Sequence, residues 1–310
     1  MNEVVTPHLQ EMAPGFHMLD VLDRGLPQYA AGWLVEGRRS YALVEVGTGA
    51  AIPLWLNALH AAGIAPERVE WILVTHVHLD HAGAAGALLK HLPNARIGVH
   101  PRGIRHLADP TRLLEAARAA WGSDFDLLGP MEPAPADRIV GLQDGAEVDL
   151  DGLRRFRVLH TPGHAPHHVC YFEETSRGVF PGDALGGIYP EGGPFGEAWH
   201  MPGIAPPMGD LPMFIRSVRR IKELAPQRLY ATHFGLKEDA RPYLDAAAGQ
   251  IALLWELCEE VSRNGGTLTD AQERVIATAL RARTTDVGNE ELRKDYRLIT
   301  EAAWNYVTQR

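Results

Sequence analysis

The sequence predicts an α/β protein in which two β-rich halves, with helices outside them, precede a helical C-terminal region. Short apolar and β-branched runs such as residues 71–75 are typical of strands that are buried on both faces. Segments such as residues 52–62 place apolar side chains at helical spacing and end before a glycine, here Gly63. From Glu238 onward the pattern is helical throughout.

The first half is expected to begin with an arm over residues 1–15 that ends at Pro14-Gly15, followed by a meander of strands. The expected strands are residues 16–22, 29–35, 41–46, 71–75 and 96–99. The expected helices are residues 52–62, 82–91 and 111–121.

Residues 101–135 form a long excursion between two expected core strands. Such a segment is either a surface elaboration or a lid over a functional site, and both interpretations stay open here. Trp121, Phe125 and Met131 favour the lid, because exposed apolar groups usually need a partner.

The second half again alternates strands with a helix before the helical C-terminal region. Its expected strands are residues 138–140, 146–150, 153–159, 169–172, 178–180 and 228–232, and its helix is 214–224. The C-terminal helices are expected at residues 243–261, 270–283 and 290–307, with a capping box of Thr269 and Gln272 opening the second. We therefore expect one domain over residues 1–235, with its insertion at 101–135, and a helical extension over 236–310.

Four potential metal ligands follow the strand at residues 71–75 within six positions: His76, His78, Asp80 and His81. A lone histidine is usually a core or surface residue, which is the alternative interpretation. Burying this many polar groups without partners would cost several kcal/mol each, so the cluster indicates a metal site. A buried strand that ends in a tight loop is the rigid support that such a site needs.

Three further candidates stand at the ends of other expected strands. His164 follows Thr161-Pro162-Gly163, Asp183 follows Gly182, and His233 closes the last strand. Each is an isolated signal, because loops of this composition are commonly mere turns. Together with the first cluster they give five histidines and two aspartates, which is the complement for two metal ions.

The motifs in this chain resemble those of the metallo-β-lactamase superfamily in content, order and approximate spacing. They are Thr75-His76-Val77-His78-Leu79-Asp80-His81, Thr161-Pro162-Gly163-His164, Gly182-Asp183 and Thr232-His233-Phe234-Gly235. The resemblance implies an αββα sandwich with metals at one edge. It also implies that His76, His78 and His164 hold one metal, that Asp80, His81 and His233 hold the second, and that Asp183 bridges them.

Imidazole and carboxylate ligands without a thiolate suit two zinc ions, with iron or manganese as alternatives. Two such ions can share a water and lower its pKa, which predicts hydrolysis of an ester, lactone or thioester of a small molecule. We expect Asp80 to be catalytic by orienting the hydroxide and carrying a proton to the leaving group. The alternatives are a small-molecule phosphodiesterase, a hydroxyacylglutathione hydrolase-type thioesterase and a non-catalytic metal-binding protein.

Residues 186–211 are the expected substrate pocket, with a surface loop as the alternative. The candidate substrate-binding residues are Tyr189, Phe195, Trp199 and Met201. Acyl-homoserine-lactone lactonases carry a tyrosine where this chain has Gly186, which argues against that activity. If the C-terminal helices instead hold glutathione, the conceivable contacts are Arg241, Tyr243 and Arg274.

The composition indicates a cytoplasmic protein with a small-molecule substrate. The net charge of −9 gives no basic footprint for nucleic acid or for an anionic membrane surface. The two cysteines imply no disulfide framework, and we recognise neither a signal peptide nor an apolar run of membrane-spanning length. A homodimer is left open.

Overall fold

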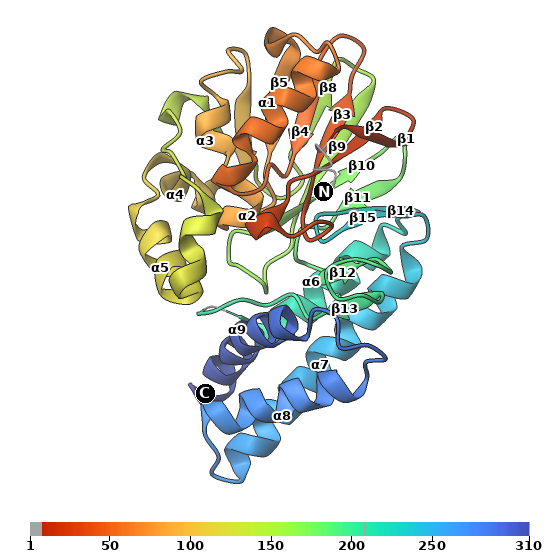
Figure 1. Cartoon of the computed structure of the whole chain (residues 1–310). Helices are drawn as coiled ribbons and strands as arrows, with labels where there is room; N and C mark the ends of the chain where they lie inside the picture. Colours follow the sequence, from red (N-terminus) through yellow and green to blue (C-terminus); the bar gives the residue numbers. More distant parts are fainter. Residues whose placement is uncertain (1–7, 208, 310) are drawn as a thin grey trace.

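The computed structural model describes residues 8–207 and 209–309, and its centre is a pair of β-sheets packed face to face (Figure 1). The first sheet has the strand order β1-β2-β3-β4-β5-β6-β7. Its strands are β1 Gln10–Ala13, β2 Phe16–Asp20, β3 Ala31–Glu36, β4 Tyr41–Val44, β5 Val69–Leu73, β6 Arg96–Val99 and β7 Ile139–Gly141. The meander of β1 to β4 is antiparallel, whereas β4 to β7 run parallel.

The second sheet has the strand order β15-β14-β11-β10-β9-β8. Its strands are β8 Glu147–Leu150, β9 Arg154–His160, β10 Val169–Glu173, β11 Gly178–Phe180, β14 Arg228–Ala231 and β15 Gly235–Lys237. A separate two-stranded sheet of β12 (Gly187–Tyr189) and β13 (Trp199–Met201) lies between this sandwich and the C-terminal helices (Figure 1).

Large aromatic side chains fill the space between the two sheets. Phe16 of the first sheet stacks on Tyr230 of the second with ring centroids 4.4 Å apart, and Phe180 stacks on the same tyrosine at 4.6 Å. All three rings are fully buried or nearly so. Burial of an aromatic side chain is among the largest apolar contributions that a core residue makes, so this stack joins the two sheets firmly.

Helices cover the outer face of each sheet. Trp55 of α1 and Val218 of α6 belong to one continuous hydrophobic core, which also includes Ile72 of β5 and Leu229 of β14. The helices are α1 Ile52–Ala61, α2 Leu79–Ala82, α3 Ala85–Leu88, α4 Ile104–Ala108, α5 Thr111–Trp121, α6 Leu211–Glu223, α7 Arg241–Arg263, α8 Leu268–Arg281 and α9 Asn289–Thr308. The 3-10 turns are Asp23–Gly25, Gly49–Ala51, Pro66–Arg68, Pro101–Gly103, Gly122–Leu128 and Ala136–Arg138.

The predicted α/β class and the αββα sandwich are confirmed, and α7, α8 and α9 form the helical C-terminal region at one end of the sandwich (Figure 1). None of the helices in the described part of the chain is both long enough and apolar enough to span a membrane.

Three local predictions are wrong. The described part of the expected N-terminal arm contains a strand, β1, because it pairs with β2. The helix expected at 82–91 is two single turns, α2 and α3, separated at Gly83 and Ala84. The capping box at α8 uses Thr267 and Asp270 in place of Thr269 and Gln272, because the helix begins two residues earlier than expected.

Candidate metal centre

The candidate metal ligands all stand just beyond the ends of strands, where loops from both sheets meet at one edge of the sandwich. β5 leads into His76 and His78, and the short helix α2 carries Asp80 and His81. The loops after β9, β11 and β14 supply the remaining three, which are His164, Asp183 and His233. All seven side chains fall into three overlapping groups whose ligand atoms lie within 4.8 Å of one another.

Glycine residues bring two of these loops close to the sandwich. Gly182, directly before Asp183, has a φ of +49°, and a Cβ there would lie 2.4 Å from Thr75 Oγ1. Gly163, directly before His164, has a φ of +138°, and a Cβ there would lie 2.4 Å from the Phe214 backbone. Only glycine fits both the space and the backbone conformation at these two positions.

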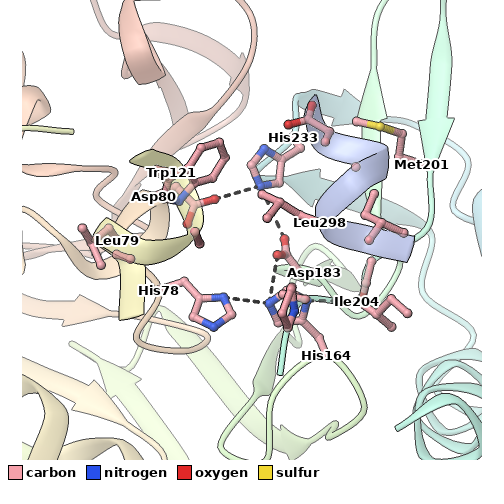
Figure 2. Close-up of a pocket in the computed structure, with 18 of the residues that line it drawn as sticks. His78, Leu79, Asp80, Trp121, His164, Asp183, Met201, Ile204, His233 and Leu298 are labelled. Atoms are coloured by element: carbon pink, nitrogen blue, oxygen red, sulfur yellow. Dashed lines mark hydrogen bonds and ion pairs between the residues drawn. The ribbon is translucent and has the colours of Figure 1, made fainter. Parts of the chain in front are cut away.

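Three histidine nitrogens converge on one point. Nε2 of His76 lies 2.9 Å from Nδ1 of His78, and Nε2 of His164 lies 3.1 and 2.9 Å from the same two atoms. Figure 2 shows His78 and His164 facing each other at the bottom of the site. Nitrogen lone pairs that face each other at these distances repel unless protons or a cation lie between them, so this trio suits a divalent cation.

A second group lies beside the first and shares Asp183 with it. Nε2 of His81 lies 3.4 Å from both Asp80 Oδ2 and Asp183 Oδ1. Nε2 of His233 lies 3.5 Å from the same two oxygens. The other Asp183 oxygen, Oδ2, lies 3.2 Å from Nε2 of His164 in the first group. Asp183 therefore faces both groups, one carboxylate oxygen toward each (Figure 2).

The second ring nitrogen of each buried histidine has a partner outside the cluster. Nδ1 of His233 donates to the Tyr29 carbonyl at 3.0 Å, and Nδ1 of His164 donates to the Gly203 carbonyl at 3.2 Å. Nδ1 of His81 donates to the Glu45 carboxylate, and Nδ1 of His76 donates to the Thr75 hydroxyl at 3.1 Å. These contacts leave the Nε2 lone pairs free to bind metal, which is the usual arrangement around ligating histidines.

The residues present fit two divalent cations. Nε2 of His81 and Oδ1 of Asp183 are both buried, and neither atom has a hydrogen-bond partner. Buried polar atoms in native proteins are normally satisfied, so orphaned atoms that face each other indicate a binding site. A donor set of imidazoles and carboxylates without a thiolate matches zinc, iron or manganese.

Burial and the neighbouring charged side chains shift the pKa values of the candidate ligands. Burial lowers the pKa of His78 to about 3, and it lowers the pKa of His76 well below its usual range. Burial acts to raise the pKa of Asp80, but the charge of His81 outweighs it and holds that pKa well below its usual range. Burial acts to lower the pKa of His233, but the adjacent carboxylates of Asp183 and Asp80 outweigh it and raise the pKa to about 10.

Glu45 is an orienting residue that the sequence analysis included in the strand expected at residues 41–46, without a role in the site. It is fully buried and accepts hydrogen bonds from the Thr75 backbone N–H at 2.8 Å and from the hydroxyls of Thr75 and Thr232 at 2.9 and 3.2 Å. It also fixes the ring of His81. The feature of the sequence that could have identified Glu45 is its place as an acidic residue directly after the apolar strand β4.

His168 orients the other side of the site. Its Nε2 accepts a hydrogen bond from the Asp183 backbone N–H at 3.1 Å, and its Nδ1 lies 2.9 Å from the Thr161 hydroxyl. His168 therefore positions the bridging carboxylate from behind.

A cavity of about 310 Å³ opens beside the cluster. Asp80, Asp183 and His233 lie at its wall, and Tyr189 and Met201 also line it, as the pocket prediction expected. Apolar residues of α5, α9 and the loop after β13 complete it, namely Leu113, Ala116, Ala117, Ala120, Trp121, Pro202, Ile204, Leu298 and Ile299. The expected lid segment thus contributes a wall through α5, with Trp121 facing the site (Figure 2).

Several predicted contact residues lie elsewhere. Phe195 is fully buried behind the cavity wall against Tyr189, with ring centroids 4.7 Å apart, and Trp199 packs against Arg283. Phe195 and Trp199 therefore lie outside the described lining of this cavity, and their part in substrate binding stays a prediction. The conceivable glutathione contacts Arg241, Tyr243 and Arg274 also lie off the cavity lining; Arg241 pairs with Asp239 at 2.8 Å and Arg274 with Glu260 at 3.8 Å.

Comparison with known proteins agrees with this geometry. Residues 27–233 match the metallo-beta-lactamase superfamily, and the chain belongs to that family. It is 25% identical over 226 residues to the metallo-beta-lactamase fold-containing protein ST1585 of Sulfurisphaera tokodaii, covering 72% of this chain and 79% of that protein.

A hydroxyacylglutathione hydrolase of Pseudomonas entomophila is 31% identical over 157 residues, which cover 49% of this chain and 46% of that enzyme. The chain thus spans less than half the length of this enzyme. Among solved structures, the metallo-beta-lactamase family protein TTHA1429 of Thermus thermophilus aligns with a TM-score of 0.69 at 23% identity, covering 96% of this chain and 95% of that one. This structural likeness shows the shared fold over nearly the whole chain.

Proposed function

We propose that this protein is a binuclear metal-dependent hydrolase that cleaves an ester, lactone or thioester bond of a small molecule. The observation that carries the proposal is the position of Asp183 between two groups of ligand atoms, with one oxygen toward each. Two divalent cations bound there supply a water that is deprotonated near neutral pH and a Lewis acid for the substrate carbonyl. Sequence similarity to a hydroxyacylglutathione hydrolase supports hydrolytic chemistry.

The residues of the chain hold and orient the reacting groups. His76, His78 and His164 would hold one cation and Asp80, His81 and His233 the other, with one Asp183 oxygen facing each group. Asp80 lines the cavity and its side chain is 27% exposed, compared with 13% for Asp183. Asp80 therefore has a carboxylate oxygen available toward the substrate, where it orients the attacking water and passes a proton to the leaving group.

The cavity lining favours a carbonyl substrate over a phosphodiester. Two metals also suit phosphate transfer, but the described residues that line this cavity include neither lysine nor arginine to hold a second phosphate oxygen. Its walls are instead largely apolar, as in sites that bind small organic molecules.

The test is a panel of an ester, a lactone, a thioester and a phosphodiester, assayed with the chelator-treated protein before and after zinc, iron or manganese is added. We expect metal-dependent hydrolysis of at least one carbonyl substrate. Asp80→Asn should lower kcat by about 100-fold or more while two metal equivalents stay bound, whereas the matched control Asp126→Asn, at an 87% exposed side chain, should not change it. Full activity of Asp80→Asn, or cleavage of the phosphodiester alone, would overturn the proposal.

A further inference from the structure

Two buried carboxylates outside the metal-ligand set line the same cavity. Asp23 stands in the 3-10 turn Asp23–Gly25, and Asp295 stands in α9 (Asn289–Thr308). Their residues are only 2% and 6% exposed. Burying an ionised carboxylate is costly unless its oxygens have partners, so the surroundings of these two side chains are informative.

Each carboxylate has one oxygen engaged and one without a hydrogen bond. Oδ2 of Asp23 accepts from Arg24 Nε at 2.9 Å, whereas its Oδ1 is buried with no hydrogen-bond partner. Oδ2 of Asp295 accepts from the Tyr29 hydroxyl at 2.8 Å, whereas its Oδ1 lies 4.0 Å from Arg24 Nη2, beyond hydrogen-bond distance. Oδ1 of Asp23 therefore has no hydrogen-bond donor in the chain, and Oδ1 of Asp295 has only this long ion pair, which leaves both oxygens able to accept from a bound ligand.

Arg24 holds the two acids in place without lining the cavity itself. Its guanidinium lies between the rings of Tyr29 and Trp121, 4.4 and 4.5 Å from their centroids. It also donates to Glu291 of α9 at 3.4 Å. One arginine thus ties the turn at Asp23 to the C-terminal helix, and its single positive charge is shared between ion pairs with both cavity carboxylates.

The rest of the cavity matches a neutral or cationic ligand. Apolar side chains form most of its wall, and the described lining contains Asp23 and Asp295 but neither lysine nor arginine. The rings of Tyr189 and Tyr29 contact each other with centroids 5.3 Å apart, and the Tyr29 hydroxyl donates to Asp295. Leu298 of α9 lines this cavity together with Asp183 and His233 (Figure 2), so the end of the cavity that carries Asp23 and Asp295 belongs to the same cavity as the metal centre.

We propose that Asp23 and Asp295 form a recognition subsite for a hydrogen-bond donor, an ammonium, hydroxyl or amide N–H group, on the part of the substrate away from the scissile carbonyl. This subsite selects neutral or cationic esters, lactones or thioesters and rejects those with a carboxylate or phosphate at that end. The inference rests on the proposed function, and it assigns to α9 a direct part in substrate recognition.

The test uses zinc-loaded protein and p-nitrophenyl esters of equal chain length whose tails end in methyl, hydroxyl, ammonium or carboxylate. We expect kcat/KM for the ammonium and hydroxyl tails to exceed that for the methyl tail by about tenfold or more, as a charge-assisted hydrogen bond provides, and the carboxylate tail to fall below it. Asp23→Asn and Asp295→Asn should each reduce the ammonium-to-methyl ratio about tenfold, mainly through KM. Asp126→Asn is the control that keeps the ratio.

Calorimetric binding of the corresponding non-hydrolysable N-methylamides separates this inference from the proposed function. The ammonium-tailed amide should bind about tenfold more tightly than the methyl-tailed one, and Asp23→Asn should remove the difference. Hydrolysis of all four tails at equal kcat/KM would overturn the subsite and leave the hydrolase standing. Selective binding of the ammonium tail without hydrolysis of any ester would support the subsite and contradict the hydrolase, whereas equal binding of both amides would overturn the subsite.

Discussion

Nε2 of His81 and Oδ1 of Asp183 lie 3.4 Å apart, and both atoms are buried without a hydrogen-bond partner. Two buried polar atoms without partners are unfavourable unless a proton or a metal cation lies between them. The charges of the surrounding carboxylates favour a proton on His81 when no metal is bound. The charges of Asp80, Asp183 and Glu45 outweigh burial and raise the pKa of His81 well above its usual range. Without metal the site therefore holds protons on His81 and His233, and metal binding must displace them.

Metal binding should therefore release protons at about pH 7.5, because His81 and His233 are protonated in the metal-free protein and neutral as ligands. We expect about two protons per chain when zinc is added to chelator-treated protein, measured with an indicator dye in weak buffer. His233→Ala should lower the release by about one proton, and His60→Ala, a substitution outside the cluster, should not. Stoichiometric zinc binding without proton release would contradict this electrostatic account.

Glu45 should control metal affinity through His81, whose ring it fixes. Glu45→Gln keeps the size of the side chain but removes the charge that favours a ligating imidazole. Metal affinity should fall about 10–100-fold, as is typical when a ligand's orienting partner is lost. Competition with a chromophoric chelator measures this, and the exposed Glu67 offers the control Glu67→Gln. Unchanged affinity in Glu45→Gln would show that His81 needs no orienting carboxylate.

Gly182 should be intolerant of a side chain, because a Cβ there meets Thr75 Oγ1 at 2.4 Å and the φ of +49° is strained for other residues. We expect Gly182→Ala to lower the free energy of unfolding by about 2 kcal/mol or more and to displace Asp183, so that metal binding weakens as well. Gly145 has a φ of +78° with nothing within 4 Å of a Cβ, so Gly145→Ala separates backbone strain from steric clash in urea unfolding. An equal loss of unfolding free energy in Gly182→Ala and Gly145→Ala would contradict a steric clash between a Cβ at position 182 and Thr75.

Asp295 should make stability depend on pH. Burial raises its pKa from 3.8 to about 6, so the folded state binds this proton more tightly than the unfolded state does. The resulting stabilisation is complete below the unfolded pKa and is lost as pH rises through about 6. In metal-free protein, wild type should therefore lose stability relative to Asp295→Asn between about pH 4 and 7, on the order of 2 kcal/mol. A pH-independent difference in unfolding free energy would contradict this.

The sequence was most informative where local chemistry determines structure. Glycines directly before His164 and Asp183 fix the loops that carry these residues, so their positions were predictable from the sequence, whereas the αββα sandwich was implied by the resemblance to the metallo-β-lactamase superfamily. The direction of Phe195 and Trp199 depends on packing against distant segments, and no local pattern records it.

Packing between distant segments also explains why the pair of cavity carboxylates, Asp23 and Asp295, was not predicted. Asp23 and Asp295 come from opposite ends of the chain, and neither lies in a motif. Only the packing of α9 against the turn at Arg24 brings them to one cavity. The C-terminal helices were expected to contribute contacts through Arg241, Tyr243 or Arg274, whereas α9 instead contributes a carboxylate and apolar side chains to the lining.

Anomalous diffraction from crystals of the zinc-loaded protein tests the central claim most directly. The account predicts two strong peaks, one among His76, His78 and His164 and one among Asp80, His81 and His233, with Asp183 at coordinating distance from both. A single peak that leaves one of the two groups without metal, or peaks away from Asp183, would contradict it.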